Sequence, residues 1–196
     1  MKLTPDLLLA AYSQGLFPMA DGEGEEALAW YEPTVRAIIP LEGFVVPRRL
    51  ARTVRSGRFE VRYDTAFAAV MAACAATGPG RESTWINGAM LAAYSELHRM
   101  GYAHSVECWC ANQLVGGLYG VSIGGLFAGE SMFHRERDAS KVALVHLVER
   151  LRAGGFVLLD SQYIVGTHML QFGTIEISRT AYLRRLRAAL RVAAVF

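Results

Sequence analysis

An uncharged stretch of 22 residues, "CWCANQLVGGLYGVSIGGLFAG" (residues 108–129), restricts the fold more than any other segment. Gly116, Gly120 and Gly124 recur in it at four-residue spacing, which is a pattern of paired transmembrane helices. However, the polar residues "ANQ" interrupt the stretch, and its six glycines would weaken any helix. β-Branched and aromatic residues alternate with glycine on either side of the turn signal "SIGG". The stretch therefore predicts strands joined in a hairpin rather than a membrane span.

Helix and strand patterns surround this hairpin. Thr4 as N-cap and Gly15 after the last apolar residue delimit a first helix, while residues 17–33 are predicted to be a loop with a strand near Trp30. Asp64 is expected to cap the third helix. Helices are expected over 5–14, 47–57, 65–78, 87–101, 139–155 and from 180 onward, and strands over 36–42, 58–64, 103–110, 114–124, 125–134, 156–162 and 174–179. This order, with three successive strands as an antiparallel meander, predicts an α+β fold with a mixed sheet and flanking helices that resembles the acetyltransferase (GNAT-like) superfold.

Composition restricts the class of protein. Of 196 residues, 53% are hydrophobic and 19% charged, which favours one ordered domain with a small appendage over a disordered chain. Three cysteines give no disulfide framework, and no cysteine or histidine pair stands at metal-site spacing, so reduced thiols are expected. The segment "MKLTPDLLLAAYSQG" has the pattern of a capped helix rather than of a signal peptide, which predicts a cytoplasmic location. A monomer is expected because no heptad pattern or large apolar stripe stands out.

Arginines are unevenly distributed along the chain. One cluster lies between residues 48 and 62 and a second between residues 184 and 191. Such clusters suit a polyanionic partner, and they are equally compatible with solvated helix faces. The sequence alone leaves both interpretations open.

Polar side chains at predicted strand ends are the candidates for chemistry. Four apolar residues, 156–159, precede Asp160 and Gln162, whose side chains are expected to project to the same side of a strand. Glu130 occupies a comparable place in "FAGESMF", and Ser131 in the same segment lacks a G-x-S-x-G context. The five histidines are scattered. A carboxylate partly removed from water with an amide beside it indicates acyl or proton transfer without a cofactor; polar capping of strand ends is the simpler alternative.

Five segments, in order and at matching spacing, resemble the motifs of the leucyl/phenylalanyl-tRNA–protein transferase family. They are "AYSQGLFPM", "STWINGAMLAAYSELHRMGYAHSVECW", "LVGGLYGVSIGGLFAGESMF", "DASKVALVHLVERL" and "LLDSQ". The resemblance extends from about Leu7 to Leu190. It implies a small N-terminal domain, residues 1–35, and a GNAT-like catalytic domain, residues 36–196. The N-terminal domain is expected to be reduced, because the segment before "AYSQGLFPM" is shorter than in longer members.

The resemblance implies a reaction and its partners. Such enzymes move leucine or phenylalanine, with methionine as a further donor, from charged tRNA to the N-terminal Arg or Lys of an acceptor protein. The product is a destabilising N-terminus, an N-degron. No metal, coenzyme or membrane is implied. The reaction turns an ester into an amide, so the protein must mainly position the two substrates.

The resemblance also implies roles for individual residues. Gln162 would hold the incoming α-amino group, with Asp160 acting through it as a base or as an anchor, and Glu130 would accept hydrogen bonds from the donor's ammonium group. Trp85 would stack on the terminal adenine of the tRNA. The pocket for the donor side chain would be formed by Leu118, Phe127 and Met132, and the tRNA backbone would contact Arg48, Arg49, Arg52 and Arg55.

Several positions depart from the family pattern. Met19 stands where a second adenine-stacking tryptophan is common, so Trp30 or Tyr31 is expected to contribute instead. His134 replaces a common serine, and the segment between Gln162 and His168 is one residue longer than usual, which puts the acceptor preference in question.

Three alternatives remain. A related transferase family uses acceptors with N-terminal Asp or Glu. An acetyl-CoA-dependent enzyme would need a glycine-containing turn where this chain has "RERDASK". A non-catalytic module that binds tRNA or protein N-termini would have lost one of the three polar site residues, and all three are present.

Overall fold

A computed structural model describes residues 3–20, 28–78, 83–164 and 167–196. Its helices are α1 (Pro5–Ser13), α2 (Arg48–Arg55), α3 (Phe67–Ala75), α4 (Gly88–Arg99), α5 (Ala139–Ala153), the 3₁₀ helix η1 (Thr167–Phe172) and α6 (Arg179–Ala189). Its strands are β1 (Phe17–Ala20), β2 (Leu28–Tyr31), β3 (Val35–Ile39), β4 (Glu60–Tyr63), β5 (Ala103–Cys110), β6 (Gln113–Ile123), β7 (Leu126–His134), β8 (Leu158–Gln162) and β9 (Ile175–Ser178).

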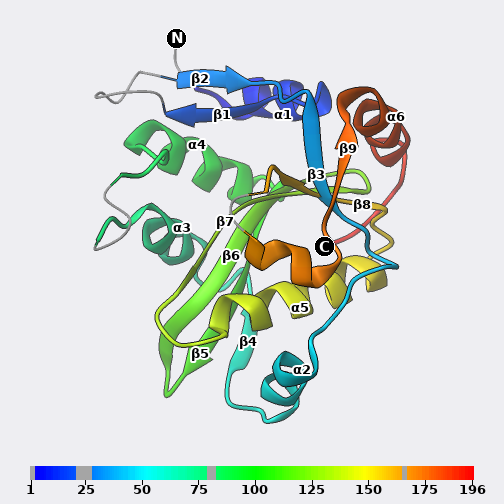
Figure 1. The fold of residues 1–196 in the computed structure, drawn as a ribbon. Coiled ribbons are helices and arrows are strands. Elements are labelled where there is room, and N and C mark those ends of the chain that lie inside the picture. The colour runs from blue at the N-terminus through cyan, green and yellow to red at the C-terminus, as the bar shows by residue number, and fades with distance from the viewer. Residues whose placement is uncertain (1–2, 21–27, 79–82, 165–166) are drawn as a thin grey trace.

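Seven strands form one sheet in the order β4-β5-β6-β7-β8-β3-β9, and β1 and β2 form a separate antiparallel pair (Figure 1). In the large sheet only β7 and β8 run parallel. The predicted α+β fold with a mixed sheet and flanking helices is confirmed. Among the described residues, no helix is long and apolar enough to cross a membrane.

The glycines of the uncharged stretch lie where β6 is closely approached by its neighbours. A Cβ atom on Gly116 would come within 2.5 Å of the Ala139 side chain at the start of α5. A Cβ atom on Gly120 would collide with the ring of Phe127 on β7. The predicted meander is confirmed, and close packing against a helix and a neighbouring strand explains the glycine spacing.

Helix α5 is the crossover connection between the parallel strands β7 and β8, as the sequence predicted. The two strands pair only from Leu126 and Leu158 to Ala128 and Asp160. Beyond that point β7 continues for six residues, whereas β8 ends at Gln162. A space between the two strands therefore opens beyond Ala128.

Two β-bulges border this opening. On β7, Tyr119 and Gly120 of β6 pair with Ser131 and Gly129, which leaves Glu130 as the extra residue. On β8, residues 37 and 38 pair with Gln162 and Asp160, which leaves Ser161 as the extra residue. Bulges redirect side chains that regular alternation would place elsewhere.

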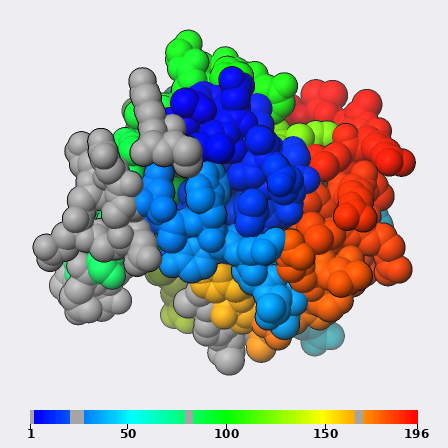
Figure 2. Space-filling view, turned by 90° about the horizontal axis from the view of Figure 1, so that it is seen from above, coloured from blue at the N-terminus to red at the C-terminus, as the bar shows by residue number. Residues whose placement is uncertain are grey.

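Helices cover both faces of the sheet. Residues of α5, with Leu50 of α2, pack on one face, and residues of α1, α3 and α4 pack on the other (Figure 1). Helix α6 packs against β3, β7 and β8 in a third apolar cluster. Viewed from above, the N-terminal segment lies beside the C-terminal segments that contain β9 and α6 (Figure 2).

Three local predictions need correction or comment. The chain at residues 17–20, predicted as loop, is strand β1, because it pairs with the predicted strand near Trp30. Asp64 does not cap α3, whose N-cap is Ala66; its carboxylate instead accepts a hydrogen bond from the Ser105 backbone N–H. The backbone N–H of Ala66 itself donates to Glu107 at 2.7 Å, and no side chain caps the first turn of α3. The predicted caps Thr4 and Asn87 are confirmed.

Candidate active site

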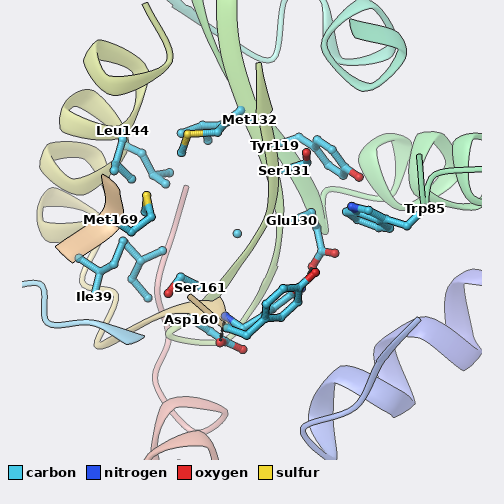
Figure 3. Close-up of a pocket in the computed structure, with 16 residues that line it drawn as sticks. Ile39, Trp85, Tyr119, Glu130, Ser131, Met132, Leu144, Asp160, Ser161 and Met169 are labelled. Carbon is cyan, nitrogen blue, oxygen red and sulfur yellow. Dashed lines mark hydrogen bonds between the residues drawn. The ribbon is translucent and has the colours of Figure 1, made fainter. Parts of the chain in front are cut away.

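A cavity of about 340 Å³ occupies the opening between β7 and β8 (Figure 3). One end is apolar, where Ile39, Met132, Leu144 and Met169 face one another, and the other end contains Glu130 and Trp85 (Figure 3). The lining residues are Ile39, Trp85, Leu118, Tyr119, Gly129, Glu130, Ser131, Met132, Leu144, Leu147, Leu159, Asp160, Ser161, Gln162, Tyr163 and Met169. This combination of an apolar end with a few polar groups is typical of small-ligand sites.

Glu130 and Gln162 are joined at the polar end of the cavity. The Gln162 Nε2 atom donates a hydrogen bond to Glu130 Oε1 at 3.0 Å, and the Tyr94 hydroxyl donates to Glu130 Oε2 at 3.5 Å. Tyr12 and Tyr94 are in turn hydrogen-bonded through their hydroxyls. Burial raises the pKa of Glu130 to about 7, although hydrogen bonds from Tyr12 and Gln162 oppose that rise. The carboxylate is therefore costly to ionise, and a ligand ammonium group would stabilise its charged form.

The backbone of Gln162 has a φ of 65°, a left-handed conformation that a non-glycine residue rarely adopts. Its amide N–H donates to Asp160 Oδ1 at 2.7 Å, which holds this conformation in place. The conformation turns the Gln162 side chain toward Glu130. Simple strand alternation did not predict this contact, because it ignores the bulge at Ser161.

The carboxylate of Asp160 is fully buried and engaged by three partners. The Arg36 guanidinium donates from Nε to Oδ1 at 3.0 Å and from Nη2 to Oδ2 at 2.6 Å. The Tyr182 hydroxyl donates to Oδ2 at 2.7 Å, and the third partner is the Gln162 backbone N–H. Arg36 is itself 1% exposed and lies between the rings of Phe17 and Tyr182, 4.6 Å from each centroid. These contacts occupy the acceptor positions of Asp160 with protein donors.

The ionisation of these partners follows from their burial and from Asp160. Burial lowers the pKa of Arg36, but the charge and hydrogen bonds of Asp160 outweigh that effect and raise it overall. Burial, with the nearby Asp160 charge, raises the pKa of Tyr182. Arg36 is thus charged and Tyr182 neutral at physiological pH, which matches their roles as donors.

The apolar end contains two of the three residues predicted for the donor pocket. Leu118 and Met132 line the cavity, whereas Phe127 does not. Phe127 is fully buried in the core, where it stacks on Phe196 and meets Phe156 edge to face. Sequence reasoning missed the remaining apolar lining residues: Ile39, Leu144, Leu147, Leu159 and Met169.

The predicted adenine-binding residues lie in different places. Trp85 lines the cavity beside Glu130, and its backbone carbonyl accepts a hydrogen bond from Ala20 at the end of β1 (Figure 3). Met19 and Trp30 lie on the small sheet and do not line the cavity. Tyr163, which was not predicted, does line it, and its hydroxyl lies 3.9 Å from the Met19 sulfur. Val165 and Gly166, in the segment predicted to be one residue longer, lie outside the described residues.

The four arginines predicted to contact tRNA are exposed on α2, whereas Leu50 of the same helix is buried against α5 and its neighbours. Within the described part of the chain, none of the four forms an ion pair. The four residues are Arg48, Arg49, Arg52 and Arg55. The structure therefore places them together on the surface and apart from the cavity.

Sequence reasoning also missed Arg36, Tyr12, Tyr94 and Tyr182. Arg36 had a visible signal, a charge among the apolar residues of "VRAII". The three tyrosines lie at apolar positions of helices and had no comparable signal. No group of three or more His, Cys, Asp or Glu residues in the described ranges could hold a metal ion. Chemically, the site can bind an apolar side chain and orient an ammonium or amine group beside it.

Comparisons with known proteins connect this geometry to a family. A family model described as leucyl/phenylalanyl-tRNA protein transferase matches residues 38–187, and a model of its N-terminal domain matches residues 1–34. A leucyl/phenylalanyl-tRNA–protein transferase of Phenylobacterium zucineum is 59% identical over 96% of this chain and 85% of that protein. Proteins of the same name from Nitrobacter winogradskyi and Caulobacter vibrioides are each 57% identical, over 98% and 95% of this chain and 83% and 86% of theirs.

Proposed function

The chain belongs to the leucyl/phenylalanyl-tRNA–protein transferase family, whose members are aminoacyltransferases that use aminoacyl-tRNA donors and protein acceptors. From this premise we propose its substrates and how its site works. The donors are tRNAs charged with leucine or phenylalanine, and methionine is accepted as a third amino acid. The acceptors begin with Arg or Lys, and the product is an N-degron. Residues 1–35 form a small N-terminal domain and residues 36–196 the catalytic domain of a cytoplasmic monomer.

The observation that carries this proposal is the polarity of the cavity, apolar at one end with Glu130 and Gln162 at the other. The donor's side chain enters the apolar end and contacts Met132, Leu144 and Met169 there. This end accepts donor side chains that are unbranched or branched at Cγ. Its ammonium group then meets the Glu130 carboxylate, which forms a charge-assisted hydrogen bond with it. The terminal adenine stacks on Trp85, which permits more than one tRNA because stacking tolerates any base.

Gln162 orients the attacking amine. Its Nε2 atom is committed to Glu130, which leaves the side-chain carbonyl oxygen to accept a hydrogen bond from the incoming α-amino group. An α-amino group has a pKa of about 8, so about a tenth of it is already the neutral nucleophile at pH 7. The C–N bond forms, the ester C–O bond breaks, and the proton lost by nitrogen is gained by the departing 3′ oxygen. The reaction needs positioning more than it needs a strong base.

Asp160 is a positioning residue in this mechanism. Its carboxylate accepts from Arg36, Tyr182 and the Gln162 N–H, and these contacts support an anchor rather than a base. Of the two roles that the sequence left open, the anchor is therefore the one we propose. It acts on the reaction by fixing the backbone of Gln162.

The test is transfer of radiolabelled leucine, phenylalanine and methionine from charged tRNA to peptides that begin with Arg, Lys, Asp or Glu. Label on Arg and Lys peptides alone is the expected result. Label on Asp or Glu peptides would keep the chemistry and overturn the acceptor assignment. If a folded protein that still binds tRNA labels none of the peptides, it is a binding module and the proposal fails.

A further inference from the structure

A second cavity, of about 520 Å³, lies between α2, the end of β7 and the start of α5. Four cationic side chains line it, and Asp138 is the one carboxylate among its described lining residues. The lining residues are Pro47, Arg49, Leu50, His134, Arg135, Arg137, Asp138, Ser140, Lys141 and Gln171. A concave surface with this excess of positive charge raises the local concentration of anions.

The positive charge is only partly compensated by the protein. Lys141 lies 3.5 Å from Asp138, a long and partly exposed ion pair. Arg135 donates to the Leu114 carbonyl at 3.0 Å, which fixes the side chain without neutralising it. Within the described ranges, neither Arg49 nor Arg137 forms an ion pair. The cavity therefore retains positive charge that a bound anion would neutralise.

Two further features of the cavity favour a bound anion: one carboxylate points away from it, and one hydroxyl points toward it. The nearby carboxylate of Glu136 is turned to Arg58, at 2.6 Å, and does not line the cavity. Ser140 does line it; this residue is only 6% exposed, and its hydroxyl makes no hydrogen bond to another residue in the part of the chain that the structure describes. Because this hydroxyl is open to the cavity, it can donate a hydrogen bond to a ligand or to water. Together with the cations, it forms the donor set that a phosphate group requires.

The second cavity adjoins the first one. Strand β7 contributes Met132 to the first and His134 to the second, which are two residues, or about 7 Å, apart along a strand. Helix α5 contributes Leu144 to the first and Lys141 to the second. The second cavity also includes Arg49, one of the four exposed arginines of α2, so it extends that basic surface toward the aminoacyl site.

We propose that this second cavity binds a backbone phosphate of the donor tRNA, with Arg137, Lys141 and Ser140 as its specific donors. The inference rests on the proposed function, because it assumes an RNA donor. It adds a defined phosphate site, built by the loop after β7 and the start of α5, to the surface arginines of α2. Backbone phosphates carry no sequence information, so such a site serves both leucine and phenylalanine tRNAs.

The experiment compares two donors with the double variant Arg137→Ala/Lys141→Ala. One donor is leucyl-tRNA, and the other is 3′-O-leucyl adenosine, which carries no phosphate. The matched control is Arg184→Ala/Arg185→Ala, which removes the same charge from exposed positions of α6. Binding of uncharged tRNA is also measured as a function of salt for all three proteins. Removing one cation that neutralises a phosphate should weaken tRNA binding roughly 8-fold at 0.1 M salt and reduce the log–log salt slope by about 0.9.

We expect the double variant to lose 8-fold or more in kcat/KM with leucyl-tRNA and to stay within 2-fold with leucyl adenosine, while the control is unaffected with both. Equal losses with both donors, or equal losses in variant and control, would overturn the proposal. Stabilisation of the three proteins by inorganic phosphate is measured as well. If the double variant loses this stabilisation but keeps the tRNA salt slope of the wild type, the cavity binds a free anion and the proposal is overturned. If the wild-type protein transfers from neither donor, the proposed function fails instead.

Discussion

Replacing Glu130 by Gln should raise the stability of the protein while lowering its activity. Burial raises the pKa of Glu130 from 4.5 to about 7 in the folded state. As the pH rises through this range, the unfolded chain releases the proton first, so ionisation favours unfolding. The full cost above pH 7 is about 3 kcal/mol, and screening inside the open cavity reduces it to about 1–3 kcal/mol. Glu130→Gln removes this cost and keeps an oxygen that can accept from Gln162.

The stability part of this prediction is read from thermal unfolding between pH 5 and pH 8. For a chain of this length, about 1–3 kcal/mol corresponds to roughly 2–12 °C in Tm. We expect the variant to have a higher Tm than the wild type at pH 8, and the two curves to approach each other toward pH 5, where Glu130 is protonated in the folded wild-type protein but still mostly ionised in the unfolded chain; they should meet only below about pH 4.5. A variant that melts at or below the wild type at pH 8 would refute the argument that Glu130 is strained by burial.

The activity part tests the role of the same carboxylate toward the donor. Loss of a charged hydrogen bond costs about 1.5–3 kcal/mol, so kcat/KM for leucyl-tRNA should fall roughly 10- to 150-fold. The wild-type kcat/KM should rise as the pH passes about 7 and Glu130 ionises in the free enzyme, and the variant should lack this component and keep only the rise near pH 8 that comes from deprotonation of the acceptor amine. Ser131→Ala, which alters a neighbouring lining residue, is the matched control. An unchanged kcat/KM with the expected gain in Tm would mean that the donor's ammonium group does not contact Glu130.

Three further predictions concern the other parts of the site. Asp160→Asn leaves Arg36 buried without a counter-charge, which should lower the free energy of unfolding by about 3–5 kcal/mol and Tm by roughly 6–20 °C. Below the melting range, kcat should fall while KM for leucyl-tRNA stays the same. A raised KM alone would argue against a role in positioning Gln162. Trp85→Ala should raise KM for charged tRNA by roughly 5- to 150-fold, as loss of base stacking predicts, and Trp85→Phe should recover most of it; an unaltered KM in the alanine variant would exclude stacking. Met132→Trp should fill the apolar end of the cavity and reduce transfer of phenylalanine more than of leucine, measured in competition; equal effects would place the donor side chain elsewhere.

The parts of the fold that the sequence predicts are those with local signals. The meander follows from glycine and β-branched patterns in one continuous stretch, and the crossover follows from an amphipathic helix ahead of an apolar strand. The position of β3 had no such signal. This strand lies between β8 and β9, whose residues are more than 115 positions later in the chain, and nothing near residue 35 indicates that partner. Long-range pairing of this kind is decided by tertiary packing rather than by local propensity.

In the site, too, the sequence predicts what local signals show and misses what depends on tertiary packing. Asp160 and Gln162 lie at the end of β8 and, with Glu130, within family motifs, so the sequence could single them out, but Glu130, predicted at a strand end, lies at the bulge in the middle of β7. Their orientations depend on the two bulges, each a single extra residue that a count of alternating positions cannot detect. This is why Asp160 and Gln162, predicted to act side by side, have their side chains bound to different partners.

The N-terminal segment takes part in the site through two sets of contacts. Arg36, which holds Asp160, also donates to the Gly15 carbonyl at 3.2 Å and stacks on Phe17 of β1. Tyr12 of α1 is hydrogen-bonded to Tyr94, whose hydroxyl reaches Glu130. Both carboxylates of the site are thus supported by residues 12–17. Because the members of a buried hydrogen-bonded network depend on one another, we expect the loss of Tyr12 or Phe17 to disturb Glu130 or Asp160 as well.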